Sequence, residues 1–78
     1  MYMRENFYVT SDLYLSAYLK VKGFKLKLIK EKNKFLFEFE KTEDILNYVN
    51  EYLTENGSCE PLSYTNAIKN IKNLLHNQ

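Results

Sequence analysis

The sequence predicts an α+β protein: one small domain with the element order (β)αββαα, in which an antiparallel hairpin packs against helices. Two patterns predict this class. Apolar and charged residues alternate with a period of two over residues 24–40, and apolar residues recur at helical spacing in three other segments. Only two glycines and one proline interrupt the 78 residues. Because a chain of this length builds one core, we expect a single domain over residues 1–78.

The N-terminal residues are expected to contribute little to the core. Residues 1–5 are predicted to be a loose end, and Phe7, Tyr8 and Val9 favour a short edge strand after it. The chain has no apolar run of the kind found in a signal peptide, and no stretch approaches the roughly 20 apolar residues that span a bilayer. We therefore expect a cytoplasmic protein with no membrane contact.

Residues 12–22 are predicted to form a helix that is apolar on most of its sides. Thr10 or Ser11 is expected to cap its start, and the next glycine to follow its end. In a chain this small, intramolecular packing is not expected to cover such a helix entirely, so we expect a homodimer through this helix and the neighbouring sheet. Tyr14 and Tyr18 lie four residues apart on one helix face, and we predict that they are protein-interface residues.

The alternation over residues 24–40 specifies a hairpin and its register. A two-residue turn at Lys32 and Asn33 pairs apolar residues on one face and lysines with glutamates on the other. The predicted pairs are Leu28 with Phe37, Leu26 with Phe39, Lys27 with Glu38, and Lys25 with Glu40. A slip by one residue would place phenylalanines opposite lysines, so one register satisfies both faces. Asn33 tolerates the positive φ that such a turn requires, although the turn lacks the glycine of a strong turn signal.

Two further helices are predicted after the hairpin. Thr42 is expected to cap the first of them, which should end near Asn56 and Gly57. Pro61 fits the first position of the last helix, because a proline there lacks an N–H that would have no helical partner. The apolar stripe of this last helix consists of Tyr64, Ala67, Ile68, Ile71, Leu74 and Leu75. Its asparagines and lysines are expected to face solvent.

Catalysis and metal binding are not predicted, because suitable functional groups are few. The chain has one cysteine, Cys59, and one histidine, His76, whereas a structural zinc site needs about four ligands and catalysis needs at least two positioned groups. The acidic residues over 38–44 are interpreted as cross-strand partners of lysines and as first-turn residues of a helix. We therefore expect no enzyme, no cofactor and no metal.

Positive charge is concentrated around the hairpin. Seven lysines and one acidic residue fall within residues 20–34, although the net charge of the chain is only +1. A basic hairpin can lie along a phosphate backbone, which makes nucleic-acid contact an alternative function. Lys25 and Lys27 are expected to be neutralised by the glutamates opposite them. The candidate nucleic-acid residues that remain are Lys20, Lys22, Lys30, Lys32 and Lys34.

Motifs at both ends of the chain form a recognisable pattern. An aromatic-Tyr-x-Thr-Ser-Asp-Leu-Tyr-Leu opening leads to a glycine and a hairpin, and a Pro-x-x-Tyr-x-x-Ala helix follows. The matching positions are Phe7, Tyr8, Thr10, Ser11, Asp12, Leu13, Tyr14, Leu15, Gly23, Pro61, Tyr64 and Ala67. With these motifs nearly the whole chain resembles a family of short uncharacterised bacterial and phage proteins. The resemblance implies an origin in phages, plasmids or integrative elements, and brings no catalytic residues with it.

These observations together predict a non-enzymatic accessory module that acts by protein–protein contact. Its partner is expected to be a second copy of the chain or another protein. A mobile-element origin would make it a regulator or an antagonist of host defence. The alternative is a small DNA-binding regulator that uses the lysine-rich hairpin and the end of the first helix.

Overall fold

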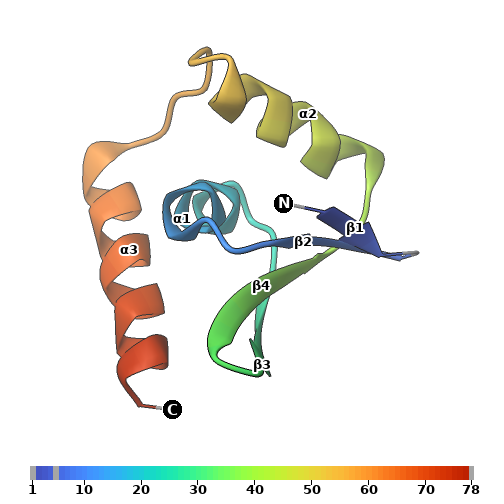
Figure 1. Ribbon diagram of the computed structural model, residues 1–78. Helices are drawn as coiled ribbons and strands as arrows, with labels where there is room; N and C mark the ends of the chain where they lie inside the picture. The colour runs from blue at the N-terminus through green and yellow to red at the C-terminus, as the bar shows by residue number, and fades with distance from the viewer. Residues whose placement is uncertain (1, 5, 78) are drawn as a thin grey trace.

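The computed structural model describes residues 2–4 and 6–77, and the side chains of residues 6–77. The elements in chain order are β1 (Tyr2–Arg4), β2 (Phe7–Thr10), α1 (Leu13–Val21), β3 (Leu26–Glu31), β4 (Lys34–Glu40), α2 (Glu43–Leu53) and α3 (Pro61–His76). The predicted α+β class is confirmed (Figure 1). Within the described part of the chain, no helix is both long and apolar enough to cross a membrane.

The strands form one antiparallel sheet in the order β1-β2-β4-β3. The prediction of a loose end over residues 1–5 is wrong for Tyr2–Arg4, which pair with Phe7–Val9 as β1, while residues 1 and 5 lie outside the described residues. β2 is consequently an inner strand and not the expected edge strand. Tyr8 and Val9 are 5% and 0% exposed, and such burial favours a strand that is hydrogen-bonded on both sides.

The predicted hairpin register is confirmed by three pairs between strands β3 and β4: Leu28 with Phe37, Leu26 with Phe39, and Lys27 with Glu38. The fourth predicted pair does not form within the sheet, because β3 begins at Leu26 and Lys25 precedes it. The pairing therefore follows the side-chain alternation, which fixes which residues share a face.

The turn of the hairpin uses the expected residues in an unexpected way. Lys32 has φ 53°, whereas φ is not positive at Asn33, so the residue that tolerates a positive φ more readily is not the one that takes it. A two-residue hairpin turn needs left-handed backbone at its first central position in both of the favoured turn types. The position of a residue in the turn therefore decides which residue has the positive φ, and the tolerance of asparagine for this conformation does not.

The two faces of the sheet differ in what covers them. Tyr8, Phe37 and Phe39 belong to the main core cluster together with helical residues, so this face packs on the helices. Side chains alternate along a strand, which places Val9 and Leu36 on the opposite face. These two are 0% and 1% exposed although they lie outside the main cluster. This second face of the sheet therefore buries a small apolar patch of its own.

Helix α1 occupies the centre of the molecule. Figure 1 shows it nearly end-on, with α2, α3 and the sheet arranged around it. Leu15, Ala17 and Leu19 are all 0% exposed. The missing polar stripe of this helix is thus explained by intramolecular packing on several sides, and the reason for expecting a homodimer through it no longer holds.

The start of α1 is capped by Asp12 and not by Thr10 or Ser11 as predicted. The Asp12 carboxylate accepts hydrogen bonds from the N–H groups of Tyr14 and Leu15, at 3.0 and 3.1 Å. Thr10 instead accepts a hydrogen bond from the Asp12 N–H through its hydroxyl, at 3.0 Å. An aspartate cap adds a charge that favours the positive end of the helix dipole.

The ends of the helices follow the expected rules, except that Glu55 and not Gly57 has the positive φ after α2. The end of α1 is confirmed, since Gly23 follows it with φ 101°. At the end of α2 the left-handed residue is Glu55, with φ 62°, although Gly57 stands two positions later. Thr42 caps α2 by accepting from the Ile45 N–H, as predicted. At α3 the prediction for the proline is also confirmed, with the preceding glutamate as cap.

Candidate functional site

Tyr14 and Tyr18, the two predicted interface residues, lie in different environments. Tyr18 is 3% exposed and belongs to the core cluster, so its assignment to an exposed interface is wrong. Its hydroxyl donates to Oε1 of Glu51 at 3.3 Å, and its ring lies 5.6 Å from that of Tyr52, because this side of α1 faces α2. Tyr14 is 51% exposed at the first turn of α1 and remains a candidate contact residue.

Tyr14 is part of a group that we call the tyrosine cluster, made of Tyr14, Tyr52 and Tyr64. The Tyr64 hydroxyl donates to the backbone oxygen of Tyr14 at 3.2 Å. The Tyr52 and Tyr64 phenols lie close enough for each to influence the pKa of the other. The three side chains come from α1, α2 and α3, so the cluster joins all three helices near the start of α1.

The phenols of Tyr52 and Tyr64 are held in their neutral form. Burial, and the neighbouring Tyr52 phenol, raise the pKa of Tyr64 to about 12. Burial and the negative charge of Asp12 raise the pKa of Tyr52 as well. At neutral pH the cluster therefore offers hydroxyl donors and acceptors and one half-exposed ring, and no nucleophile or base.

The loop before α3 is shaped around the buried tyrosine of α1. A Cβ added at Gly57 would lie 2.5 Å from the Tyr18 hydroxyl oxygen and 2.8 Å from the ring carbon that bears it. A side chain cannot be accommodated at this distance without displacing Tyr18. The glycine predicted to end α2 therefore serves close packing, and its φ is not in the left-handed region.

The few reactive groups are not brought together. Cys59 precedes α3 and is half-buried, whereas His76 is the last residue of this 16-residue helix. A helix of that length is about 24 Å long, which places the two side chains at opposite ends of it. Among the residues that the structure describes, no three His, Cys, Asp or Glu side chains are grouped to hold a metal ion.

The five candidate nucleic-acid lysines are distributed over three places. Lys22 lies over two aromatic rings, with its Nζ 5.3 Å from the centre of the Tyr18 ring and 5.6 Å from that of Tyr48. Lys30 lies 6.0 Å from the ring centre of Phe35. The remaining lysines are Lys32 in the hairpin turn, Lys34 at the start of β4, and Lys20 on the opposite side of α1 from α2. Only the hairpin tip keeps several of them together.

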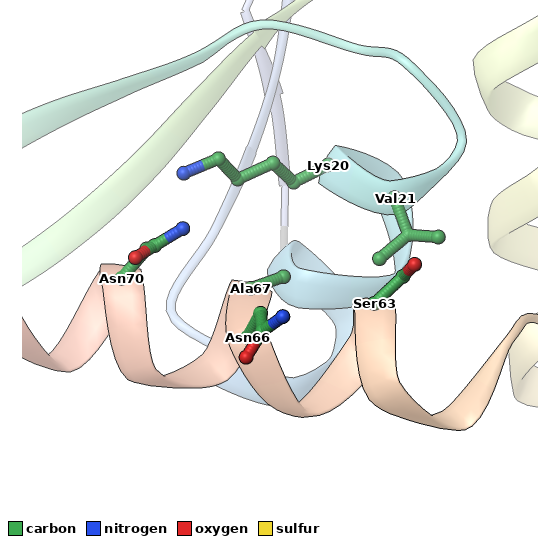
Figure 2. Close-up of a pocket in the computed structure, with 6 residues that line it drawn as sticks. All are labelled: Lys20, Val21, Ser63, Asn66, Ala67 and Asn70. Carbon is green, nitrogen blue, oxygen red and sulfur yellow. The ribbon is translucent and has the colours of Figure 1, made fainter.

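Lys20 borders a hollow of about 330 Å³ between the end of α1 and the first half of α3 (Figure 2). The lining residues are Lys20, Val21, Ser63, Asn66, Ala67 and Asn70. Figure 2 shows the Lys20 side chain extended towards Asn70 across the hollow. An ammonium group, two amides and a hydroxyl favour an oxygen-bearing ligand group, and the hollow is open to solvent. The sequence did not indicate it, because the two asparagines were assigned only to a solvent-facing surface.

Sequence reasoning also missed the role of Tyr52 and Tyr64. Both belong to apolar stripes at helical spacing, which predicts core packing and says nothing about which hydroxyls meet. The signal that was available is the number of tyrosines, seven in 78 residues, since tyrosine combines a packing ring with a polar group at its end.

The fold is that of a small α+β domain, and the tyrosine cluster with its exposed Tyr14 ring is its candidate contact surface. The residues that the structure describes form no metal centre. The chain matches the model of a domain of unknown function, DUF5659, over residues 5–77, and it belongs to this family. Searches of curated proteins and of solved structures gave no match.

Proposed function

We propose that the protein is a non-enzymatic accessory module that acts by protein–protein contact, with the tyrosine cluster as its contact surface. The observation that supports this proposal is the exposed ring of Tyr14, which is 51% exposed although its backbone is fixed from both sides. Asp12 caps the turn that carries it, and the Tyr64 hydroxyl holds its carbonyl oxygen. A rigid aromatic side chain loses little conformational entropy on binding, which is why such residues dominate protein interfaces.

The same proposal includes the setting in which the module acts. We place it in the cytoplasm of a bacterium, as the product of a phage or another mobile element, with a role as a regulator or an antagonist of host defence. The motifs at both ends of the chain support this setting, together with a composition rich in lysine, asparagine and isoleucine.

Capture of partners from the native host tests the role of Tyr14. Tyr14→Ala removes a half-exposed side chain that lies outside the core cluster, so the variant should fold and lose partner capture by at least tenfold. Leu74→Ala is the matched control, since Leu74 is a 40% exposed apolar residue near the other end of α3. Equal capture by the wild type and the Tyr14 variant would contradict the proposal.

DNA binding is the alternative, and it is supported only by the exposed lysines of the hairpin tip. Lys22 lies over aromatic rings and Lys20 borders the hollow between α1 and α3, so neither adds to that tip. Retardation of duplex DNA at low salt that disappears when Lys30, Lys32 and Lys34 are replaced by Gln would favour the alternative. We expect no retardation from either protein.

A further inference from the structure

The outer edge of β3 is open. β3 stands at the end of the strand order and pairs only with β4, so among the described residues no strand occupies its other side (Figure 1). It has six residues, against three in β1 at the opposite edge of the sheet. An open edge of this length presents a row of backbone donors and acceptors with which a further strand can pair.

The turn determines which residues of β3 present their backbone groups at this edge. Glu31 and Lys34 flank the two-residue turn, and such a pair exchanges hydrogen bonds within the hairpin. Because the direction of these bonds alternates along a strand, Ile29 and Lys27 also face β4 with their N–H and C=O groups. The backbone groups of Leu28 and Lys30 point outwards from the sheet.

This alternation restricts how a second copy of β3 could pair. In an antiparallel pair, a residue that points outwards must lie opposite another that points outwards. A two-fold axis must therefore pass through one residue of β3 and not between two. An axis at Lys27 or Lys30 places identical charges opposite each other. An axis at Leu28 places Lys27 opposite an isoleucine, which gives no ion pair.

An axis at Ile29 gives a different result. It places Lys27 of each copy opposite Glu31 of the other, and the two Ile29 side chains opposite each other. We propose that a second copy of this chain pairs antiparallel with β3 about a two-fold axis at Ile29, which joins the two sheets into one. The interface is isologous, as expected for a symmetric dimer.

The neighbouring strand supports this register, since it extends the pattern on the sheet face that bears Leu36. Within one chain Ile29 pairs with Leu36, Lys27 with Glu38, and Glu31 with Lys34. Across the dimer this produces a central row of four aliphatic side chains, two from each copy. On either side of it lies a row in which negative and positive charges alternate through both sheets. The buried patch of Leu36 is thereby continued into the second copy.

Lysines on an edge strand can also serve to keep other strands away. One observation argues against that role for Lys30, since its Nζ lies over Phe35 of its own hairpin. In the proposed register Lys27 would meet a glutamate and would not repel the second strand. The contact adds backbone hydrogen bonds and a short apolar row, an interface smaller than that of a permanent dimer. We therefore expect a dimer that forms reversibly with rising concentration.

Charge exchange tests the register. In sedimentation velocity up to concentrations on the order of millimolar, the wild type is expected to shift from monomer to dimer. Lys27→Glu and Glu31→Lys each place like charges opposite one another twice in their own dimers, so each variant should lose at least tenfold in dimer affinity. An equimolar mixture of the two variants restores both ion pairs and should form heterodimers. Circular dichroism of each variant confirms that it is folded.

Lys30→Pro is an independent test. The N–H that it removes points away from β4, so the hairpin keeps its own hydrogen bonds while the dimer loses two of its own. The variant should be folded and monomeric. A wild type that is monomeric throughout, a mixture that remains monomeric, or a Lys30→Pro protein that dimerises normally would each overturn the proposal.

The dimer does not depend on the proposed function of the tyrosine cluster. Tyr14→Ala leaves β3 unchanged and should dimerise as the wild type does. If this variant alone dissociates the dimer, the second copy binds through α1 and the pairing at β3 is wrong. If it dimerises but also captures partners normally, the β3 inference stands and the role of Tyr14 fails.

Discussion

Helix α1 and the β3–β4 hairpin are both rich in apolar residues, but the fold uses them differently. α1 is covered by α2, α3 and the sheet, and Leu15 and Leu19 have no exposed surface. The hairpin packs one face on the core through Phe37 and Phe39, and among the described residues no strand pairs with the outer edge of β3. Judged by apolar content alone, α1 would be the surface expected to associate. Its central position in the fold buries it, so the hairpin is the better candidate.

The difference shows why a patterned segment can be the better candidate for binding. A helix that is apolar on all sides is suited to a central position, where several neighbours cover it. A strand that alternates between apolar and charged residues keeps its backbone available at an edge and uses its charges to select a register. Association through β3 therefore requires no exposed apolar helix.

The largest expected effect comes from a core leucine of α1. Leu15→Ala should lower the free energy of unfolding by about 2–5 kcal/mol, because it removes buried methyl groups and leaves a cavity among several neighbours. Chemical denaturation followed by circular dichroism measures the change. Leu28→Ala is the matched control, since Leu28 is only half-buried on the hairpin and should cost less. Equal losses for the two leucines would break the comparison between the segments.

A smaller effect of opposite sign is expected at the hairpin turn. Lys32→Gly should raise the free energy of unfolding by about 1 kcal/mol, since Lys32 has φ 53° and a residue with a Cβ is strained there. Asn33→Gly serves as the control and should not stabilise the protein, because φ at Asn33 is not positive. The same denaturation measurement distinguishes the two. Stabilisation by Asn33→Gly alone would show that the turn is of a different type.

The smallest effect is expected at the tyrosine cluster, which joins α1 to the other helices. It is a change in stability that appears only at alkaline pH. Burial on folding raises the pKa of Tyr64 to about 12 from its ordinary value of about 10, so the folded protein holds the phenol proton more tightly than the unfolded chain. The contribution to stability is complete below pH 10 and is lost as the pH rises towards 12. Phenolate absorbance during an alkaline titration measures it, and Tyr64→Phe should remove the latest-titrating phenol. An unchanged titration would contradict the assignment.

The hairpin and the helices could be predicted from the sequence because their signals are local. The register of β3 and β4 follows from an alternation that leaves only one pairing in which both faces are satisfied. Thr42 and Pro61 mark helix starts through hydrogen bonds and φ angles within a few residues. β1 could not be predicted, because residues 2–4 have no strand pattern of their own. They form a strand because they pair with β2.

The candidate sites were less predictable, since they depend on contacts between distant segments. Tyr14 and Tyr18 share a helix and a spacing, yet one is half-exposed and the other is buried against α2. The lysines around the hairpin looked like a single basic group in sequence, but Lys22 lies over aromatic rings and Lys20 beside α3. Helical spacing shows which residues share a face of the helix. It does not show which other segment that face packs against.

By itself, the sequence determined the α+β class, the hairpin register and the starts of the last two helices, because alternation, caps and a proline act over a few residues. The tertiary structure alone decided that α1 is central, that the N-terminal residues extend the sheet, and that Gly57 makes room for Tyr18. It also decided that β3 remains at an open edge. These features arise from packing between segments far apart in the chain, and packing is set by shape and volume that no short pattern of residues encodes.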